Sequence, residues 1–241
     1  MNIEKATGFV RRAFIRLYGQ LYGAQAVAQG EGFLILRKAD GDHTAVLFDP
    51  STELLASFGQ APLSKGVFGA YAWYLNARTG RSVIRTYQFS VGGVAYSVNS
   101  FFIFAREELT RLSRRMKRQK GYPRRLLQEL TLFGGVVHEL RHERQAREET
   151  SPIHWKRWRG TLRISGCYPP FNGRAGVLEL SHRKLVRSYD WYRKYPALHR
   201  FMVATEEDAH ALQFQLMADL PHLWQHNRPL AMRRAMDALR H

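Results

Sequence analysis

The spacing of apolar residues changes along the chain, from a pattern typical of strands in the first half to one typical of helices in the second. The segment 1–22 is an exception within the first half, because Val10, Phe14 and Tyr18 recur there on one helical face while its arginines lie elsewhere. A transit peptide is the alternative interpretation of this arginine-rich segment. We expect a helix that docks on the protein core and ends near Gly23, because large aromatic side chains need an apolar partner.

Short apolar runs after this helix predict two β-hairpins. Runs at 30–38 and 44–48 are separated by Asp40-Gly41-Asp42, and runs at 82–89 and 94–104 are separated by Gly92-Gly93. Asp-Gly and Gly-Gly pairs are typical of tight hairpin turns, and the flanking runs are rich in β-branched and aromatic residues. The run at 67–75 is compatible with either a strand or a helix.

From Arg106 onward the pattern is helical. Apolar residues recur at helical spacing between 126 and 140, and Gly134-Gly135 either divides two helices or allows close packing within one. Residues 151–183 carry frequent glycine and proline turn signals, and 186–195 is a helical segment that ends before Pro196. Thr205 and Asp208 form a capping pair that opens the last helical region.

These patterns predict one α+β domain over residues 1–241. We expect residues 1–105 to be a sheet-rich part that contains an antiparallel sheet, and residues 106–241 to be a helical part. The chain has 45% hydrophobic residues, enough for one core of this size.

The chain is strongly basic, with 37 Lys and Arg against 20 Asp and Glu and a net charge of +17. Between Arg106 and Arg125 there are nine Lys or Arg residues and two acids. Such a segment is either a solvated helix face or a contact strip for nucleic acid or another polyanion.

Two further features concern location. No run of 18 apolar residues exists, so no transmembrane helix is expected, and the N-terminus lacks the pattern of a secretory signal. The single cysteine, Cys167, precludes an intramolecular disulfide. We therefore expect a cytoplasmic protein.

The segment His138-Glu139-Leu140-Arg141-His142 carries the clearest chemistry in the chain. On a helix, His138 and His142 lie on one face about one turn apart, where two imidazole nitrogens can bind one zinc ion. Glu139 is then close enough to take a proton from a metal-bound water without being a ligand itself. The pattern predicts a zinc site with Glu139 as the general base.

A catalytic zinc normally has three protein ligands. Glu206 is the preferred third ligand, because it lies in an acidic helix start and Ala209 leaves room for close packing. Glu207 is the alternative, and His210 and His154 are weaker ones. The acids at 206 and 207 could instead be present because acids are favoured in the first turn of a helix.

With Glu206-x-x-Ala209 downstream, the His-Glu-x-x-His segment resembles the gluzincin metallopeptidases, and most closely the short bacterial and phage-type zincins. The resemblance covers 126–145 and 203–220 and departs from the family pattern in Arg141 and in the 63 residues between His142 and Glu206. It implies a zincin-like fold, zinc held by His138, His142 and Glu206, and hydrolysis of a protein or peptide substrate with Glu139 as the base.

We keep two other hypotheses of function. The first is a basic, nucleic-acid-associated accessory protein of a mobile element or phage, in which the motif is incidental. The second is a zincin-fold protein without catalysis that acts through interaction with other molecules.

Overall fold

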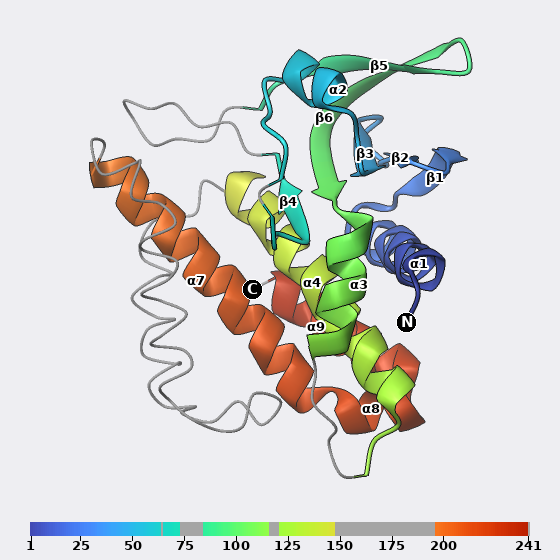
Figure 1. Cartoon of the computed structure of the whole chain (residues 1–241), viewed down its shortest axis with the longest axis vertical. Helices are drawn as coiled ribbons and strands as arrows, with labels where there is room; N and C mark the ends of the chain where they lie inside the picture. The colour runs from blue at the N-terminus through green and yellow to red at the C-terminus, as the bar shows by residue number, and fades with distance from the viewer. Residues whose placement is uncertain (64, 73–83, 116–120, 148–195, 241) are drawn as a thin grey trace.

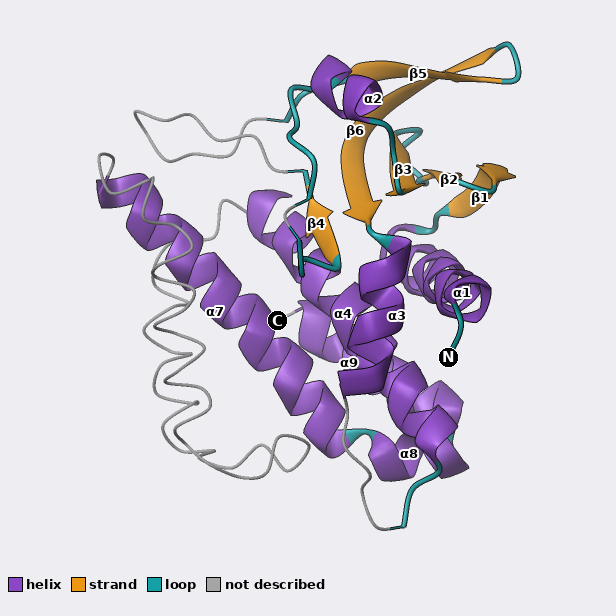
Figure 2. Cartoon of the chain, viewed as in Figure 1, coloured by secondary structure: helices purple, strands orange, loops and turns teal. Residues whose placement is uncertain are grey.

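The computed structural model describes residues 1–63, 65–72, 84–115, 121–147 and 196–240. In these residues a mixed sheet in the N-terminal half is followed by a helical C-terminal half (Figure 1; Figure 2). The strands are β1 Gln25–Gly30, β2 Phe33–Arg37, β3 His43–Phe48, β4 Gly69–Tyr71, β5 Tyr87–Val91 and β6 Val94–Phe104. The helices are α1 Ile3–Tyr22, α2 Thr52–Ser57, α3 Arg106–Arg115, α4 Arg124–Arg147, α7 Pro196–Asp219, α8 Pro221–His226 and α9 Arg228–Arg240. The predicted α+β class is confirmed.

The sheet is mixed, with the strand order β1-β2-β3-β6-β4 and with β5 also paired to β6. Four pairings are antiparallel, but β3 and β6 run parallel to each other. The expectation of an antiparallel sheet was therefore wrong for the pairing of β3 with β6. A parallel pairing needs a long crossover connection, and β3 and β6 are separated in the sequence by α2, β4 and β5.

Both predicted hairpins are present. Strands β2 and β3 pair on either side of the Asp40-Gly41-Asp42 turn, and β5 and β6 pair around Gly92 and Gly93. The two glycines have φ angles of 58° and 80°, which the tight turn between twisted strands requires. Strand β1 was missed, because its sequence Gln-Ala-Val-Ala-Gln-Gly has little apolar character.

Helix α1 docks on the core as expected. Its N-terminus is capped by the Asn2 side chain, and Gly23 ends it in the left-handed conformation with φ 61°. Val10, Phe14 and Tyr18 are fully buried, and the Phe14 ring meets the Phe102 ring of β6 edge-on at 4.8 Å. The aromatic stripe of this segment is therefore part of the core.

Helix α4 is a single helix of 24 residues that contains the glycine pair. A Cβ atom added to Gly134 would lie 3.0 Å from the Met217 sulfur on α7, and one added to Gly135 would lie 3.0 Å from Phe68. The two glycines thus allow neighbours to approach α4 on two of its faces. Figure 1 shows α7 lying along α4.

We expect Gly134→Val to destabilise the protein by about 1–3 kcal/mol, because the branched side chain must displace Met217 and push α7 away from α4. Chemical denaturation of the variant and the wild type would measure the change. Gly41→Val is the control for a glycine with no atom near its added Cβ, although its φ of 91° adds backbone strain of its own. Unchanged stability in Gly134→Val would show that α7 does not pack this closely.

Helix α7 begins at Pro196, so the expected helix start at Thr205 was wrong. Proline is favoured in the first turn of a helix, and the sequence from 197 to 204 contains no residue that would end one. The segments 151–183 and 186–195 lie outside the described residues. Within the part of the chain that the structure describes, no helix combines the length and the low polarity needed to cross a membrane.

The basic segment 106–125 includes α3, which has one buried face with Leu109 and Leu112. On its other side Arg106 donates to Asp49 at 2.7 Å and to Glu31 at 3.0 Å. Some of the positive charge of this segment is therefore already paired within the protein. Residues 116–120 lie outside the described part.

Candidate metal centre

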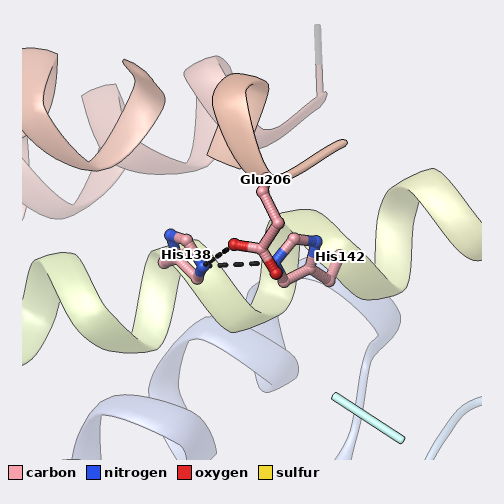
Figure 3. Close-up of side chains that lie close together, drawn as sticks. All are labelled: His138, His142 and Glu206. Atoms are coloured by element: carbon pink, nitrogen blue, oxygen red, sulfur yellow. Dashed lines mark hydrogen bonds and ion pairs between the residues drawn. The ribbon is translucent and has the colours of Figure 1, made fainter. Parts of the chain in front are cut away.

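Helices α4 and α7 bring three side chains of the sequence prediction together. His138 and His142 project from one face of α4, and their Nε2 atoms are 3.1 Å apart. Glu206 reaches across from α7 and places one carboxylate oxygen 3.5 Å from the His138 Nε2 atom and the other 3.4 Å from the His142 Nε2 atom. Figure 3 shows the carboxylate of Glu206 facing both rings.

The spacing of these three donors fits a zinc ion. In a tetrahedral site with ligands at about 2.0–2.1 Å from zinc, neighbouring donor atoms are about 3.3–3.4 Å apart. Here the two Nε2 atoms are 3.1 Å apart, and each lies 3.4–3.5 Å from a different oxygen of Glu206. Taken as one donor atom from each residue, the three ligand atoms lie within 4.8 Å of one another, close enough to converge on one ion. Among the described residues, His138, His142 and Glu206 form the group of potential ligands that could hold a metal ion. Two imidazoles and one carboxylate are also the donor types that catalytic zinc sites use.

The charges of the cluster favour a cation. Burial lowers the pKa of His142, but the nearby Glu206 carboxylate outweighs burial and raises this pKa to about 9. Burial acts in the opposite direction on Glu206, yet His142 and His138 hold its pKa well below the usual range. Glu206 is therefore ionised at neutral pH and paired with a protonated His142, and a bound metal ion would replace that proton.

Glu139 lies on α4 between the two histidines and is only 2% exposed. Burial raises the pKa of its carboxyl group, while a backbone hydrogen bond from Tyr71 on β4 acts in the opposite direction. Its Oε2 atom has no hydrogen-bond partner in the described part of the chain. A buried carboxylate with a raised pKa and one oxygen left over is suited to accept and return a proton.

Three residues behind the histidine pair connect α4 to α7. The His142 Nδ1 atom lies 2.9 Å from the Gln145 side-chain oxygen, and the Gln145 amide group donates to Asp208 at 2.6 Å and to the Thr205 carbonyl at 3.1 Å. Arg141, which is 6% exposed, also donates to Asp208 at 2.6 Å. With its Nδ1–H donated to Gln145, His142 has Nε2 left as its metal-binding atom, once a metal ion displaces the Nε2 proton.

We expect Gln145→Leu to weaken zinc binding by about 10–100-fold, the usual effect of losing a group that orients a metal ligand. The leucine removes the acceptor for His142 and one link to α7. Competition with a zinc-binding dye would measure the affinity. Gln128→Leu, a buried change near the start of the same helix, serves as the control. Equal affinities in the two variants would mean that Gln145 does not orient His142.

Sequence reasoning did not identify Gln145 or Asp208 as part of the site. A signal for Gln145 was available, because positions 138, 142 and 145 share one face of a helix. Asp208 was interpreted as a capping residue. In the structure residues 205–208 lie in the interior of α7, and Asp208 is paired with Arg141. That interior position also removes the explanation of Glu206 as an acid in a first helical turn.

Of the alternative ligands, His210 lies close to the cluster, whereas the Glu207 side chain and His154 are not described by the structure. The His210 Nε2 atom is 3.8 Å from Glu206, and the His210 ring is 4.5 Å from that of His138. Burial and the positive charge of the neighbouring histidines lower the pKa of His210 to about 3, so it is neutral at pH 7. The side chain of Glu207 and all of His154 lie outside the described residues.

The strand nearest to the site is β4 and not β6. Strand β6 is central in the sheet and pairs with β3, β4 and β5. Strand β4, only three residues long, contacts α4 and carries the Tyr71 that binds Glu139. In the described part of the chain, no strand pairs with the outer edge of β4.

Another part of α4 is anchored by Glu143, which is fully buried. Its carboxylate accepts hydrogen bonds from Tyr18 of α1, from Ser100 of β6 at 2.6 Å and from Arg147 at 3.1 Å. Lys38 lies 3.9 Å from the same oxygen. This network ties α4 to α1 and to the sheet.

Comparison of the chain with protein-family models, with curated proteins and with solved structures gave no match. The case for a function therefore depends on the residues of the site and on their geometry.

Proposed function

We propose that the protein is a zinc-dependent metallopeptidase in which His138, His142 and Glu206 hold the metal and Glu139 is the general base. The observation that carries this proposal is the position of Glu206. It comes from a helix distant in sequence, yet its two oxygens lie 3.4 and 3.5 Å from the two histidine nitrogens. If the His-Glu-x-x-His match were incidental, we would expect its histidines to face solvent on an exposed helix. Instead both histidines are buried, and an ionised carboxylate contacts them.

The chemistry of the proposal divides between the metal and the protein. Zinc, when bound, lowers the pKa of a coordinated water to about 7 and polarises a peptide carbonyl. Glu139 takes the proton of the attacking water and delivers it to the nitrogen of the leaving amine. Gln145 keeps His142 in the tautomer that binds metal, and the Arg141–Asp208 pair holds α7, and with it Glu206, against α4.

The peptide substrate in this proposal extends along β4. An extended chain can add to the edge of a sheet through main-chain hydrogen bonds, and no described strand pairs with the outer edge of β4. The Tyr71 backbone at this strand already binds Glu139, so a peptide would pair with the other main-chain groups of β4. Substrate recognition by backbone pairing would make cleavage depend on an extended conformation of the substrate. The side-chain preference would then come from pockets next to the edge.

The direct test is to measure zinc in the purified protein by mass spectrometry and to incubate it with a peptide library. One zinc per chain and cleavage that a chelator stops and added zinc restores would support the proposal. A protein that never retains zinc would refute it. Zinc retention without cleavage of any peptide in the library would favour a zincin-fold protein that acts through binding.

A further inference from the structure

A second site candidate lies away from the metal cluster, where α1, α4, α8 and α9 meet. Two adjoining cavities there have volumes of about 290 and 180 Å³ and share part of their lining. The shared residues are Phe9, Arg12, Arg125 and Glu129. The larger cavity alone approaches the size at which small-molecule sites begin, about 300 Å³, and the two together exceed it. None of the metal-binding residues lines either cavity.

The inner cavity is lined by four arginines and one acid. The arginines are Arg12, Arg16, Arg125 and Arg228. The acid, Glu129, is largely buried and binds Arg125 at 3.2 Å and Arg228 at 2.7 Å. It therefore orients two guanidinium groups at the rim. No ion pair within the described residues involves Arg12 or Arg16, and both side chains are exposed on α1. The excess of positive charge is thus built into the cavity and is not neutralised by the protein.

The floor of this cavity is aromatic. Phe133 and Trp224 lie 4.7 Å apart between ring centroids, Phe9 lies 6.4 Å from Trp224, and the Arg228 guanidinium covers Trp224 at 5.0 Å. Trp224 is 4% exposed, and its indole Nε1 atom has no hydrogen-bond partner among the described residues.

We propose that this cavity binds a phosphate ester joined to an aromatic base, with Arg12 and Arg16 on the phosphate and the base on the Phe9 side. Guanidinium groups bind phosphate oxygens in pairs, and aromatic side chains stack with bases of any sequence. The ligand with this chemistry is either a free nucleotide or a nucleotide of a single strand. Apart from Arg125, the cationic residues that line the two cavities lie outside the segment 106–125.

The probes that test the proposal are thymidine monophosphate, inorganic phosphate and a fluorescent dodecamer of deoxythymidine, each titrated at low salt. We expect the monophosphate and the dodecamer to bind, and inorganic phosphate to bind more weakly than the monophosphate. A dodecamer that binds more tightly than the monophosphate identifies a strand as the ligand, and equal affinities identify a free nucleotide. A wild type that binds neither base-containing probe, or binds inorganic phosphate equally well, overturns the proposal.

Two double variants are matched. The test variant combines Arg12→Glu with Arg16→Glu, and the control variant combines Arg233→Glu with Arg234→Glu. Both pairs lie at exposed helix positions and change the net charge equally, but Arg233 and Arg234 line neither cavity. We expect the first pair to lower affinity about tenfold or more for each base-containing probe, and the second pair to leave it near wild type. If the dodecamer binds, the first pair should also reduce the slope of log affinity against log salt by about 1.4, since each phosphate contact on a single strand contributes about 0.7.

Equal losses in the two pairs would mean long-range attraction of a polyanion to a basic protein, and would overturn the assignment of the cavity. Phe9→Leu is a second variant that keeps an apolar side chain and removes the stacking surface. It should weaken the monophosphate without affecting inorganic phosphate. The metal site plays no part in these measurements, so their outcome is independent of the peptidase proposal.

Discussion

Replacement of Glu139 by glutamine is expected to lower peptide cleavage by about 10²–10⁴-fold while zinc stays bound, because an amide cannot accept the proton of the attacking water. Glutamine has nearly the shape of glutamate, and the three proposed ligands are unchanged. The carboxylate is also buried with a raised pKa, so the substitution removes a charge that burial already disfavours. We therefore expect the variant to be at least as stable as the wild type. Zinc content, cleavage rate and thermal unfolding measure the three parts of this expectation.

Glu143→Gln is the matched control for this experiment, because Glu143 is a buried carboxylate on the same helix that binds Tyr18, Ser100 and Arg147 and lies outside the metal cluster. This variant should lose stability, by about 1–3 kcal/mol for a weakened buried network, and keep its turnover per folded molecule. Equal activity in Glu139→Gln and in the wild type would contradict the role of Glu139 as the base. If zinc is still bound in that case, the result would favour a zincin-fold protein that does not use Glu139 as a general base.

The fold was predictable from sequence wherever local chemistry determines the structure. Both hairpins depend on turn residues that few other conformations accommodate, and α1 depends on an apolar face that ends at Gly23. The parallel pairing of β3 and β6 was not predictable, because strand direction depends on how the whole segment between them crosses the sheet. Strand β1 lacked an apolar signal and is defined by its pairing with β2.

The convergence of His138 and His142 was predictable for the same local reason, and the surroundings of this pair were not. Two histidines four residues apart converge on any helix, but the approach of Glu206 depends on the packing of α7 against α4. That packing requires Gly134 to face Met217. The roles of Arg141 and Asp208 also follow from this contact, since each side chain is paired by the other helix. An arginine inside the motif, unusual as a sequence feature, is therefore explained by its partner.

Loss of Glu206 is expected to remove zinc binding itself. In Glu206→Gln the third donor loses its charge, and zinc affinity should fall by more than the about 10–100-fold that losing a supporting residue costs. Zinc at 100 times its dissociation constant stabilises a folded protein by about 2.7 kcal/mol, so the wild type should unfold at a higher temperature with zinc than with a chelator. This difference should disappear in Glu206→Gln. The quantity to compare is the difference in unfolding temperature between zinc and chelator within each variant. The unfolding temperature of the metal-free form alone is not comparable, because Glu206→Gln also loses the His142–Glu206 ion pair.

Two control variants make this measurement decisive. Glu207→Gln removes the neighbouring carboxylate, and His210→Ala removes the imidazole that lies 3.8 Å from Glu206. Both should keep most of the stabilisation by zinc if Glu206 is the third ligand. If Glu207→Gln loses the effect and Glu206→Gln keeps it, the ligand is the neighbouring residue and α7 must be rotated about its own axis to present it. His138→Ala should behave as Glu206→Gln does, because each of these variants leaves two donors where zinc needs three.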